Sequence, residues 1–311
     1  MHTHVFFCSE PLRTSVLEGC EAGFLVPATS EAEARAISRE KSIGVSKQGR
    51  RGNKNQRKEA CLVHFVGAGS GATDLITVRG KGLLEQADVV IYAGSLVNPA
   101  LLGFCREDAK IFNSAEMHLD EVLDVMKANR DAEVVRLHTG DPSIYGAIRE
   151  QMDALDELGI AYDVTPGVSS FFAAAASVGC EYTLPGISQT VIITRMEGRT
   201  PVPEGQQLAK LAVHGASMVI FLSASMTGKV QEALLSGSYN ADTPAAIVYK
   251  ASWPEEKICR CRLGDLDATA KQAGISKTAL ILVGDFLGDT PNYEKSKLYD
   301  ATFTTEYRKG I

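Results

Sequence analysis

The sequence lacks the features by which membrane proteins, exported proteins and nucleoside-triphosphate-binding proteins are recognised. No apolar run in the 311 residues reaches the ~18 residues of a membrane-spanning helix. The first residues have neither the basic start nor the apolar stretch of a signal peptide, so we expect a cytoplasmic protein. Its seven scattered cysteines favour reduced thiols over a disulfide framework. No GxxxxGK[ST] motif is present, which excludes a P-loop.

Basic residues are outnumbered by acidic residues over most of the chain. The whole sequence has 32 basic and 38 acidic residues, for a net charge of −6. Residues 1–60 hold ten Lys and Arg and seven Asp and Glu, which leaves 22 against 31, or −9, for residues 61–311. Such an acidic body argues against a general binder of nucleic acid or of anionic membranes.

A break in composition near residue 60 indicates an N-terminal extension, residues 1–60. Its segment 47–58 contains six basic residues, no acid and no large apolar side chain. Such a segment buries too little surface to repay the entropy of ordering it, so we expect a solvated basic linker. A local contact with an anion or RNA is the alternative.

From residue 61 onward, short apolar runs alternate with longer helical stretches, which predicts an α/β fold. A break at Leu184-Pro185-Gly186 suggests two α/β domains, 61–184 and 185–290, with a tail at 291–311. The first sheet should be largely parallel. The second should be mixed, because strands 245–249 and 258–263 lie too close for a helical crossover. We expect the remaining strands at 62–66, 89–92, 110–112, 133–138, 162–164, 191–194, 218–222 and 279–283, and helices at 74–86, 119–128, 144–158, 169–178, 204–212, 228–236 and 266–273.

A glycine-rich loop, residues 67–72, follows the first strand. Its glycines permit a tight turn and a close backbone approach to a ligand. A dinucleotide-binding loop would also need an acid at the end of the second strand, but Asp88 lies at the start of that strand. The residues leave open a ligand-lining loop and a plain strand–helix turn.

Two further turns follow predicted strands. In HTGDPSIYG (138–146), Asp141 could cap the next helix or attract a cationic ligand. In TPGVSS (165–170), Ser169 could be a helix N-cap. Because ligands of open α/β sheets bind at the carboxyl ends of the strands, the three turns together suggest one shared cleft. His138 is expected to be a packed histidine at a strand end rather than a base.

Six segments, taken in order, resemble the tetrapyrrole methyltransferase family. They are VGAGSGATDLIT (66–77), YAGSLV (92–97), HTGDPSIYGA (138–147), PGVSS (166–170), SQT (188–190) and RMEGRTPVPE (195–204). The resemblance covers about residues 61–290. It implies two α/β domains with an interdomain active-site cleft, S-adenosylmethionine as methyl donor, a tetrapyrrole substrate and a homodimer. YAGSLV and EGRTP point to a branch that methylates a carbon of a corrin precursor.

The same resemblance assigns site residues motif by motif. No general base is carried over, because Ala93 stands where related methyltransferases have an aspartate. Ser70 stands where the family's glycine loop often has proline, so the Gly-Asp-Pro segment matches the family better than Ser70 does. Arg195 and Arg199 suit the carboxylates of a tetrapyrrole, although surface ion pairs with Glu197 or Glu204 are the alternative. The donor site would comprise Gly140, Asp141, Ile144, Ser169, Ser170, Leu222 and Ala251, and the substrate site Gly69, Ser70, Gly71, Arg195 and Arg199.

Other classes of function remain as alternatives. The fold is shared by methyltransferases that act on RNA ribose or on a modified protein histidine, and the acidic body disfavours RNA. A tetrapyrrole carrier or a dinucleotide oxidoreductase is the third class, and the missing ribose-binding acid disfavours the oxidoreductase. Cys259 and Cys261 share one face of a strand but have no further ligands nearby, so no metal site is expected.

Overall fold

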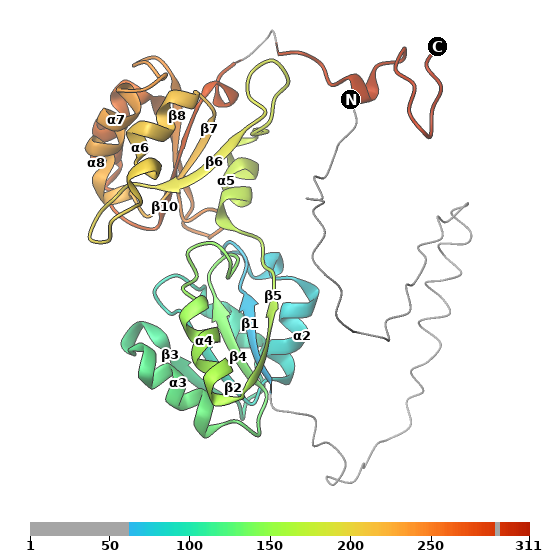
Figure 1. The fold of residues 1–311 in the computed structure, drawn as a ribbon, viewed down its shortest axis with the longest axis vertical. Coiled ribbons are helices and arrows are strands. Elements are labelled where there is room, and N and C mark those ends of the chain that lie inside the picture. The colour runs from blue at the N-terminus through green and yellow to red at the C-terminus, as the bar shows by residue number, and fades with distance from the viewer. Residues whose placement is uncertain (1–61, 290–292) are drawn as a thin grey trace, which may run out of the picture. The chain divides into compact units, whose positions relative to one another are not determined.

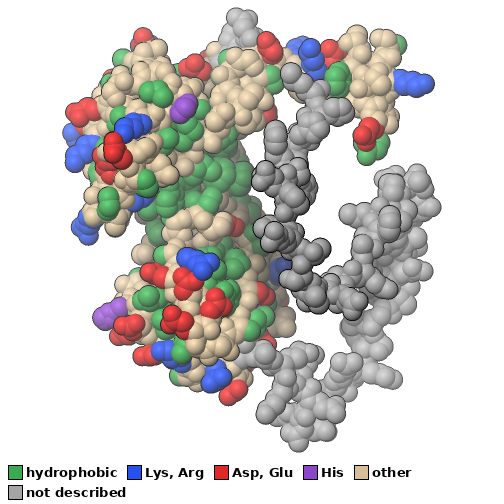
Figure 2. All heavy atoms as spheres, in the orientation of Figure 1, with side chains coloured by type: hydrophobic (Ala, Val, Ile, Leu, Met, Phe, Trp, Pro, Cys, Tyr) green, Lys and Arg blue, Asp and Glu red, His purple; other side chains and the backbone are tan. Residues whose placement is uncertain are grey.

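Two five-stranded sheets with helices on their faces make up the fold (Figure 1). The computed structural model describes residues 62–289 and 293–311, so the predicted extension and basic linker lie outside the described residues. The expected α/β class is confirmed, whereas the predicted domain boundary near residue 184 stays a prediction. Within the described ranges, no helix is long and apolar enough to cross a membrane, and Figure 2 shows charged side chains of both signs on the face in view.

The first sheet is entirely parallel, as predicted, in the order β3-β2-β4-β1-β5. Its central strand β4 is buried on both faces, as is typical of a parallel sheet, and the polar side chains of Arg136 and His138 are buried with it. Helices α3 and α4 cover one face, and α2 covers the other. The elements are β1 (Leu62–Gly67), α2 (Val78–Gln86), β2 (Val89–Tyr92), β3 (Lys110–Asn113), α3 (Leu119–Ala128), β4 (Val134–His138), α4 (Arg149–Leu158) and β5 (Ala161–Thr165).

The second sheet is mixed, also as predicted, in the order β6-β7-β10-β8-β9. Strands β6 and β7 are parallel, while β10 runs antiparallel to β7 and β8, and β8 to β9. Helices α6, α7 and α8 pack on one face. The elements are β6 (Val191–Arg195), α6 (Leu208–Leu211), β7 (Ser217–Phe221), α7 (Thr227–Leu235), β8 (Pro244–Tyr249), β9 (Lys257–Arg262), α8 (Leu266–Ala273) and β10 (Ala279–Val283).

Helix α5 (Ser170–Val178) joins the two sheets. It follows β5 of the first sheet, yet its Phe171 and Ala174 pack against Val219 and Val248 of the second (Figure 1). The turn before α5 therefore lies where the carboxyl ends of the first sheet meet the second sheet.

Three predicted helices differ from the structure. The predicted helix 74–86 is interrupted, since Thr77 caps a new helix by accepting a hydrogen bond from the Gly80 amide. Helix 144–158 was predicted too long: α4 begins at Arg149, because Tyr145 and Ala147 have positive φ angles of 55° and 49°. The predicted helix 204–212 is divided into a 3₁₀ turn, the short α6 and a second 3₁₀ turn.

Candidate active site

The three glycine-bearing turns meet, as the sequence suggested. Gly69 and Gly140 form an antiparallel bridge, with N···O distances of 3.3 and 2.9 Å. A Cβ on Gly167 would lie 2.1 Å from the Gly140 carbonyl oxygen and 2.7 Å from the Gly67 Cα. Only glycine permits this approach, so the turns after β1, β4 and β5 form one packed unit.

Asp141 ties two of these turns together. One carboxylate oxygen accepts the Gly167 amide proton at 2.9 Å, and the other accepts from the amide (2.9 Å) and the hydroxyl of Ser143. Partial burial alone would raise the pKa of Asp141, but these hydrogen bonds outweigh it and hold the pKa below its ordinary value. Asp141 is therefore an ionised brace between turns and not the cap of α4, which starts eight residues later.

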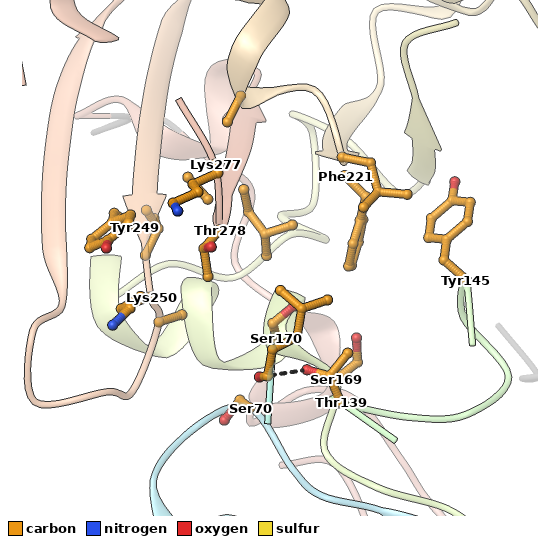
Figure 3. Close-up of a pocket in the computed structure, with 18 of the residues that line it drawn as sticks. Ser70, Thr139, Tyr145, Ser169, Ser170, Phe221, Tyr249, Lys250, Lys277 and Thr278 are labelled. Carbon is orange, nitrogen blue, oxygen red and sulfur yellow. Dashed lines mark hydrogen bonds between the residues drawn. The ribbon is translucent and has the colours of Figure 1, made fainter. Parts of the chain in front are cut away.

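A cavity of about 690 Å³ lies above these turns, within the usual size range of ligand pockets. Tyr145 and Phe221 stand at one end, and Lys250 and Lys277 at the other (Figure 3). Hydroxyl groups of Ser70, Thr139, Ser169 and Ser170 lie along the floor between them. The cavity thus offers an aromatic end, a hydroxyl-rich floor and a cationic end.

The backbone around this cavity is strained. Tyr145, Leu222, Lys250 and Thr278 all line it and all have positive φ angles of 48–55°, which side-chain-bearing residues rarely adopt. The Lys250 amide donates to the Thr278 carbonyl at 2.9 Å, which links two of these positions. Such strain is concentrated at functional sites, and it puts the half-exposed side chains of Tyr145 and Leu222 on the cavity wall.

The glycine-rich loop is docked on the second half of the fold. The Ser70 and Ser252 hydroxyl oxygens lie 2.9 Å apart, and Ser252 Oγ also accepts from the Ala72 amide at 3.0 Å. A Cβ on Gly71 would lie 2.0 Å from the indole of Trp253, so this position must be glycine. Of the loop residues predicted to bind substrate, Ser70 reaches the cavity, whereas Gly69 and Gly71 are not among its lining residues.

Neither predicted arginine lines the cavity. Arg195 donates to the carbonyl oxygens of Thr200 (3.2 Å) and Pro201 (2.8 Å), so it holds the loop that follows β6. Arg199 lies on this loop with its side chain exposed. The ion pairs considered as the alternative are not formed within the described ranges, where Glu204 pairs with Lys210 instead.

The structure brings together all seven residues that the resemblance assigned to the donor. Gly140, Asp141, Ile144, Ser169, Ser170, Leu222 and Ala251 line the same cavity. Tyr145, Phe221, Lys250, Lys277 and Thr278 were missed. Tyr145 lay in a predicted helix, and no pattern in the sequence distinguished the strand ends that carry the others.

His138 is packed at the end of β4, as expected, and lies outside the cavity lining. It is 4% exposed, its ring centroid is 5.9 Å from that of Phe65, and its Nε2 has no hydrogen-bond partner in the described part of the chain. Burial and the nearby Arg136 guanidinium lower its pKa to about 3. It is therefore neutral at pH 7 and too weak a base to take a proton there.

A pH dependence of folding stability follows from His138. Its folded pKa lies below the value of about 6.5 in the unfolded chain, so its stabilising effect is complete above pH 6.5 and is lost as the pH falls toward 3. Between pH 7 and 5 we expect this to remove about 2 kcal/mol of unfolding free energy. His138→Phe should flatten that part of the profile in urea titrations. The exposed His118→Phe is the control, and an equal flattening there would contradict the assignment.

Known proteins resemble this chain in sequence and in fold. Residues 62–267 match the family described as tetrapyrrole (corrin/porphyrin) methylases. A cobalt-precorrin-4 C(11)-methyltransferase of Methanocaldococcus jannaschii is 55% identical over 258 residues, which cover 82% of this chain and 98% of that protein. The solved structure of a cobalt-precorrin-4 methyltransferase, CbiF, is 46% identical, with a TM-score of 0.72 over 73% of this chain and 96% of that one.

A more distant structure shares the fold. It is a uroporphyrin-III C-methyltransferase of Thermus thermophilus, solved in complex with S-adenosylhomocysteine. It is 24% identical, with a TM-score of 0.63 over 73% of this chain and 98% of that one.

Proposed function

Because the chain belongs to the tetrapyrrole (corrin/porphyrin) methylase family, we propose that it methylates carbon 11 of cobalt-precorrin-4, or of the cobalt-free precorrin-4, in cobalamin biosynthesis. S-adenosylmethionine is the methyl donor, and precorrin-5 or its cobalt complex and S-adenosylhomocysteine are the products. The observation that carries the proposal is one cavity lined by every residue that the family motifs assign to the donor.

The cavity is suited to the chemical groups of S-adenosylmethionine. Tyr145 and Phe221 offer apolar surface to a flat base, and the floor offers hydroxyl groups to a ribose. Lys250 and Lys277 offer positive charge to the donor's carboxylate, and the ionised Asp141 offers negative charge to its ammonium or sulfonium group. Lys250 is held in place by Glu255 at 3.3 Å and lies 4.7 Å from the Trp253 ring centroid.

Catalysis of this reaction depends mainly on positioning the donor methyl group and the macrocycle carbon. The donor supplies an electrophilic methyl group on a sulfonium, so a macrocycle carbon can form the new C–C bond with its own π-electron pair while the C–S electron pair stays on sulfur. The positive charge passes from sulfur to the macrocycle, which loses a proton to solvent. Holding the two atoms in line at about 3–3.5 Å supplies much of the rate enhancement. The packed turns and strained walls serve that purpose, and no side chain of the described residues needs to act as a strong base. The family also supports a cytoplasmic homodimer, which sedimentation of the purified protein tests.

Arg199 is the proposed contact for a substrate carboxylate. Its guanidinium is exposed, whereas Arg195 already donates to backbone carbonyls. We expect Arg199→Ala to weaken tetrapyrrole binding about tenfold, the size of a charge-assisted hydrogen bond, with no effect on S-adenosylhomocysteine. Isothermal titration with each ligand measures both, and Arg79→Ala in α2 is the control. Equal loss of the two affinities, or of neither, contradicts the assignment.

Mass spectrometry tests the reaction directly. The protein is incubated with methyl-labelled S-adenosylmethionine and a system that generates precorrin-4, with and without cobalt. One label on carbon 11 is the expected result, and the preferred mixture identifies the substrate. Turnover of the donor with no labelled macrocycle would support S-adenosylmethionine as the donor but contradict the proposed substrate. The alternatives would then be another tetrapyrrole position, RNA ribose or a diphthine-type protein substrate.

A further inference from the structure

Strand β4 carries a buried guanidinium that has no acid partner among the described residues. Arg136 of β4 is 7% exposed and forms no ion pair within the described residues. Its Nε donates to Gln151 Oε1 at 3.1 Å, and its Nη1 donates to the Ile91 carbonyl at 3.2 Å. Burial lowers its pKa to about 10, so it stays charged at neutral pH. Burying a charged group that has only neutral hydrogen-bond acceptors costs free energy, and losing one of those acceptors would cost more. The Gln151 oxygen is therefore held in place by its bond to Arg136.

Gln151, which Arg136 holds in place, is also hydrogen-bonded to the strained loop. Its side chain on α4 is 5% exposed, and its Nε2 donates to the Ala147 carbonyl at 3.0 Å. Because Arg136 occupies the amide oxygen, the amide nitrogen must face Ala147. The orientation of the carboxamide is therefore set by the arginine.

The loop between Pro142 and Ile148 depends on such support. Tyr145 and Ala147 both have positive φ angles, and a Cβ on Gly146 would lie 2.0 Å from the Pro142 carbonyl oxygen. Positive φ is unfavourable at residues with side chains and persists only where neighbours enforce it. This same loop places Ile144 and Tyr145 on the cavity wall.

We propose that Gln151 is a positioning residue: held by Arg136, it clamps the Ala147 carbonyl and thereby keeps Ile144 and Tyr145 in their ligand-binding places. The clamp acts from outside the cavity, since neither Arg136 nor Gln151 lines it. Its effect on ligand affinity rests on the proposed donor site, whereas its effect on the loop does not.

Gln151→Glu separates the clamp from folding. The carboxylate still accepts from Arg136, now as an ion pair, but it cannot donate to the Ala147 carbonyl. We expect an unchanged or higher melting temperature, faster hydrogen–deuterium exchange over residues 142–148, and about tenfold weaker S-adenosylhomocysteine binding, the size of one lost hydrogen bond. The only tryptophan, Trp253, lines the cavity, so its fluorescence reports the titration.

A matched control lies on α2. Gln86 Nε2 donates to the Gly82 carbonyl at 2.9 Å, the same bond to the residue four positions earlier, at an exposed site. Gln86→Glu should leave exchange over residues 142–148 and ligand affinity unchanged. Unchanged exchange of that loop in Gln151→Glu overturns the inference whatever the ligand is. If the wild-type protein fails to bind S-adenosylhomocysteine, the proposed function fails, and the exchange data still decide the clamp.

Discussion

Gly167→Ala should reduce the affinity for S-adenosylhomocysteine roughly 100-fold in a protein that still folds. The added methyl carbon would lie 2.1 Å from the Gly140 oxygen and 2.7 Å from the Gly67 Cα, and both are backbone atoms that no rotamer change can move. The turns after β1, β4 and β5 must therefore separate by about 1 Å, and a shift of that size costs roughly 100-fold in a positioned site. Titration followed by Trp253 fluorescence measures the loss.

Gly82→Ala is the control for the effect of the methyl group itself. Gly82 lies inside α2, and a Cβ there would meet nothing within 4 Å. Alanine should stabilise the helix by about 1 kcal/mol without changing ligand affinity. Wild-type affinity in Gly167→Ala would show that ligand binding does not depend on close packing of the three turns, which contradicts the proposed site.

The meeting of the turns could be foreseen because it follows from topology. Each turn ends a strand of one parallel sheet, and the carboxyl ends of such strands share an edge. The short apolar runs that predicted β1, β4 and β5 therefore also predicted that Gly67, Gly140 and Gly167 lie near one another. The packing of α5 on the second sheet was not foreseen, because the sequence of an alanine-rich helix does not indicate which of two sheets it will pack against.

The strained wall could not be foreseen for a different reason. Local propensity favours continuing α4 back through Tyr145 and Ala147, and nothing local marks their positive φ angles. The contacts that accompany those angles, among them the Gln151 side-chain bond to the Ala147 carbonyl and the close approach of Gly146 to the Pro142 carbonyl, have no recognisable signal in the sequence. Arg195 was predicted to face a substrate carboxylate, but its partners are carbonyls of a loop whose path the sequence does not reveal.

Asp141→Asn should weaken donor binding by about 10- to 100-fold, although asparagine has nearly the same shape as aspartate. Three donors, two from Ser143 and one from Gly167, share the two carboxylate oxygens of Asp141. An asparagine has one acceptor oxygen, so either Ser143 or the Gly167 amide faces an NH₂ group that cannot accept. Leaving such a group unsatisfied costs about 1–3 kcal/mol and loosens the turn that packs against Gly140, and the substitution also removes the negative charge offered to the donor.

Asp300→Asn tests whether the effect belongs to this brace. One oxygen of Asp300 accepts from both the amide (2.9 Å) and the hydroxyl (2.8 Å) of Thr302, and asparagine keeps that oxygen. Donor affinity should then stay at the wild-type value.

A pH series tests the ionisation of the brace. Hydrogen bonds hold the pKa of Asp141 in the folded protein below its ordinary value, so the brace stabilises the fold fully above the ordinary pKa. That stabilisation is lost as the pH falls through the lowered pKa of the folded protein. Between pH 8 and 5 the ratio of wild-type to Asp141→Asn affinity should therefore be constant. A ratio that shrinks across this range would mean that Asp141 titrates there, and a direct proton-linked role would replace the brace.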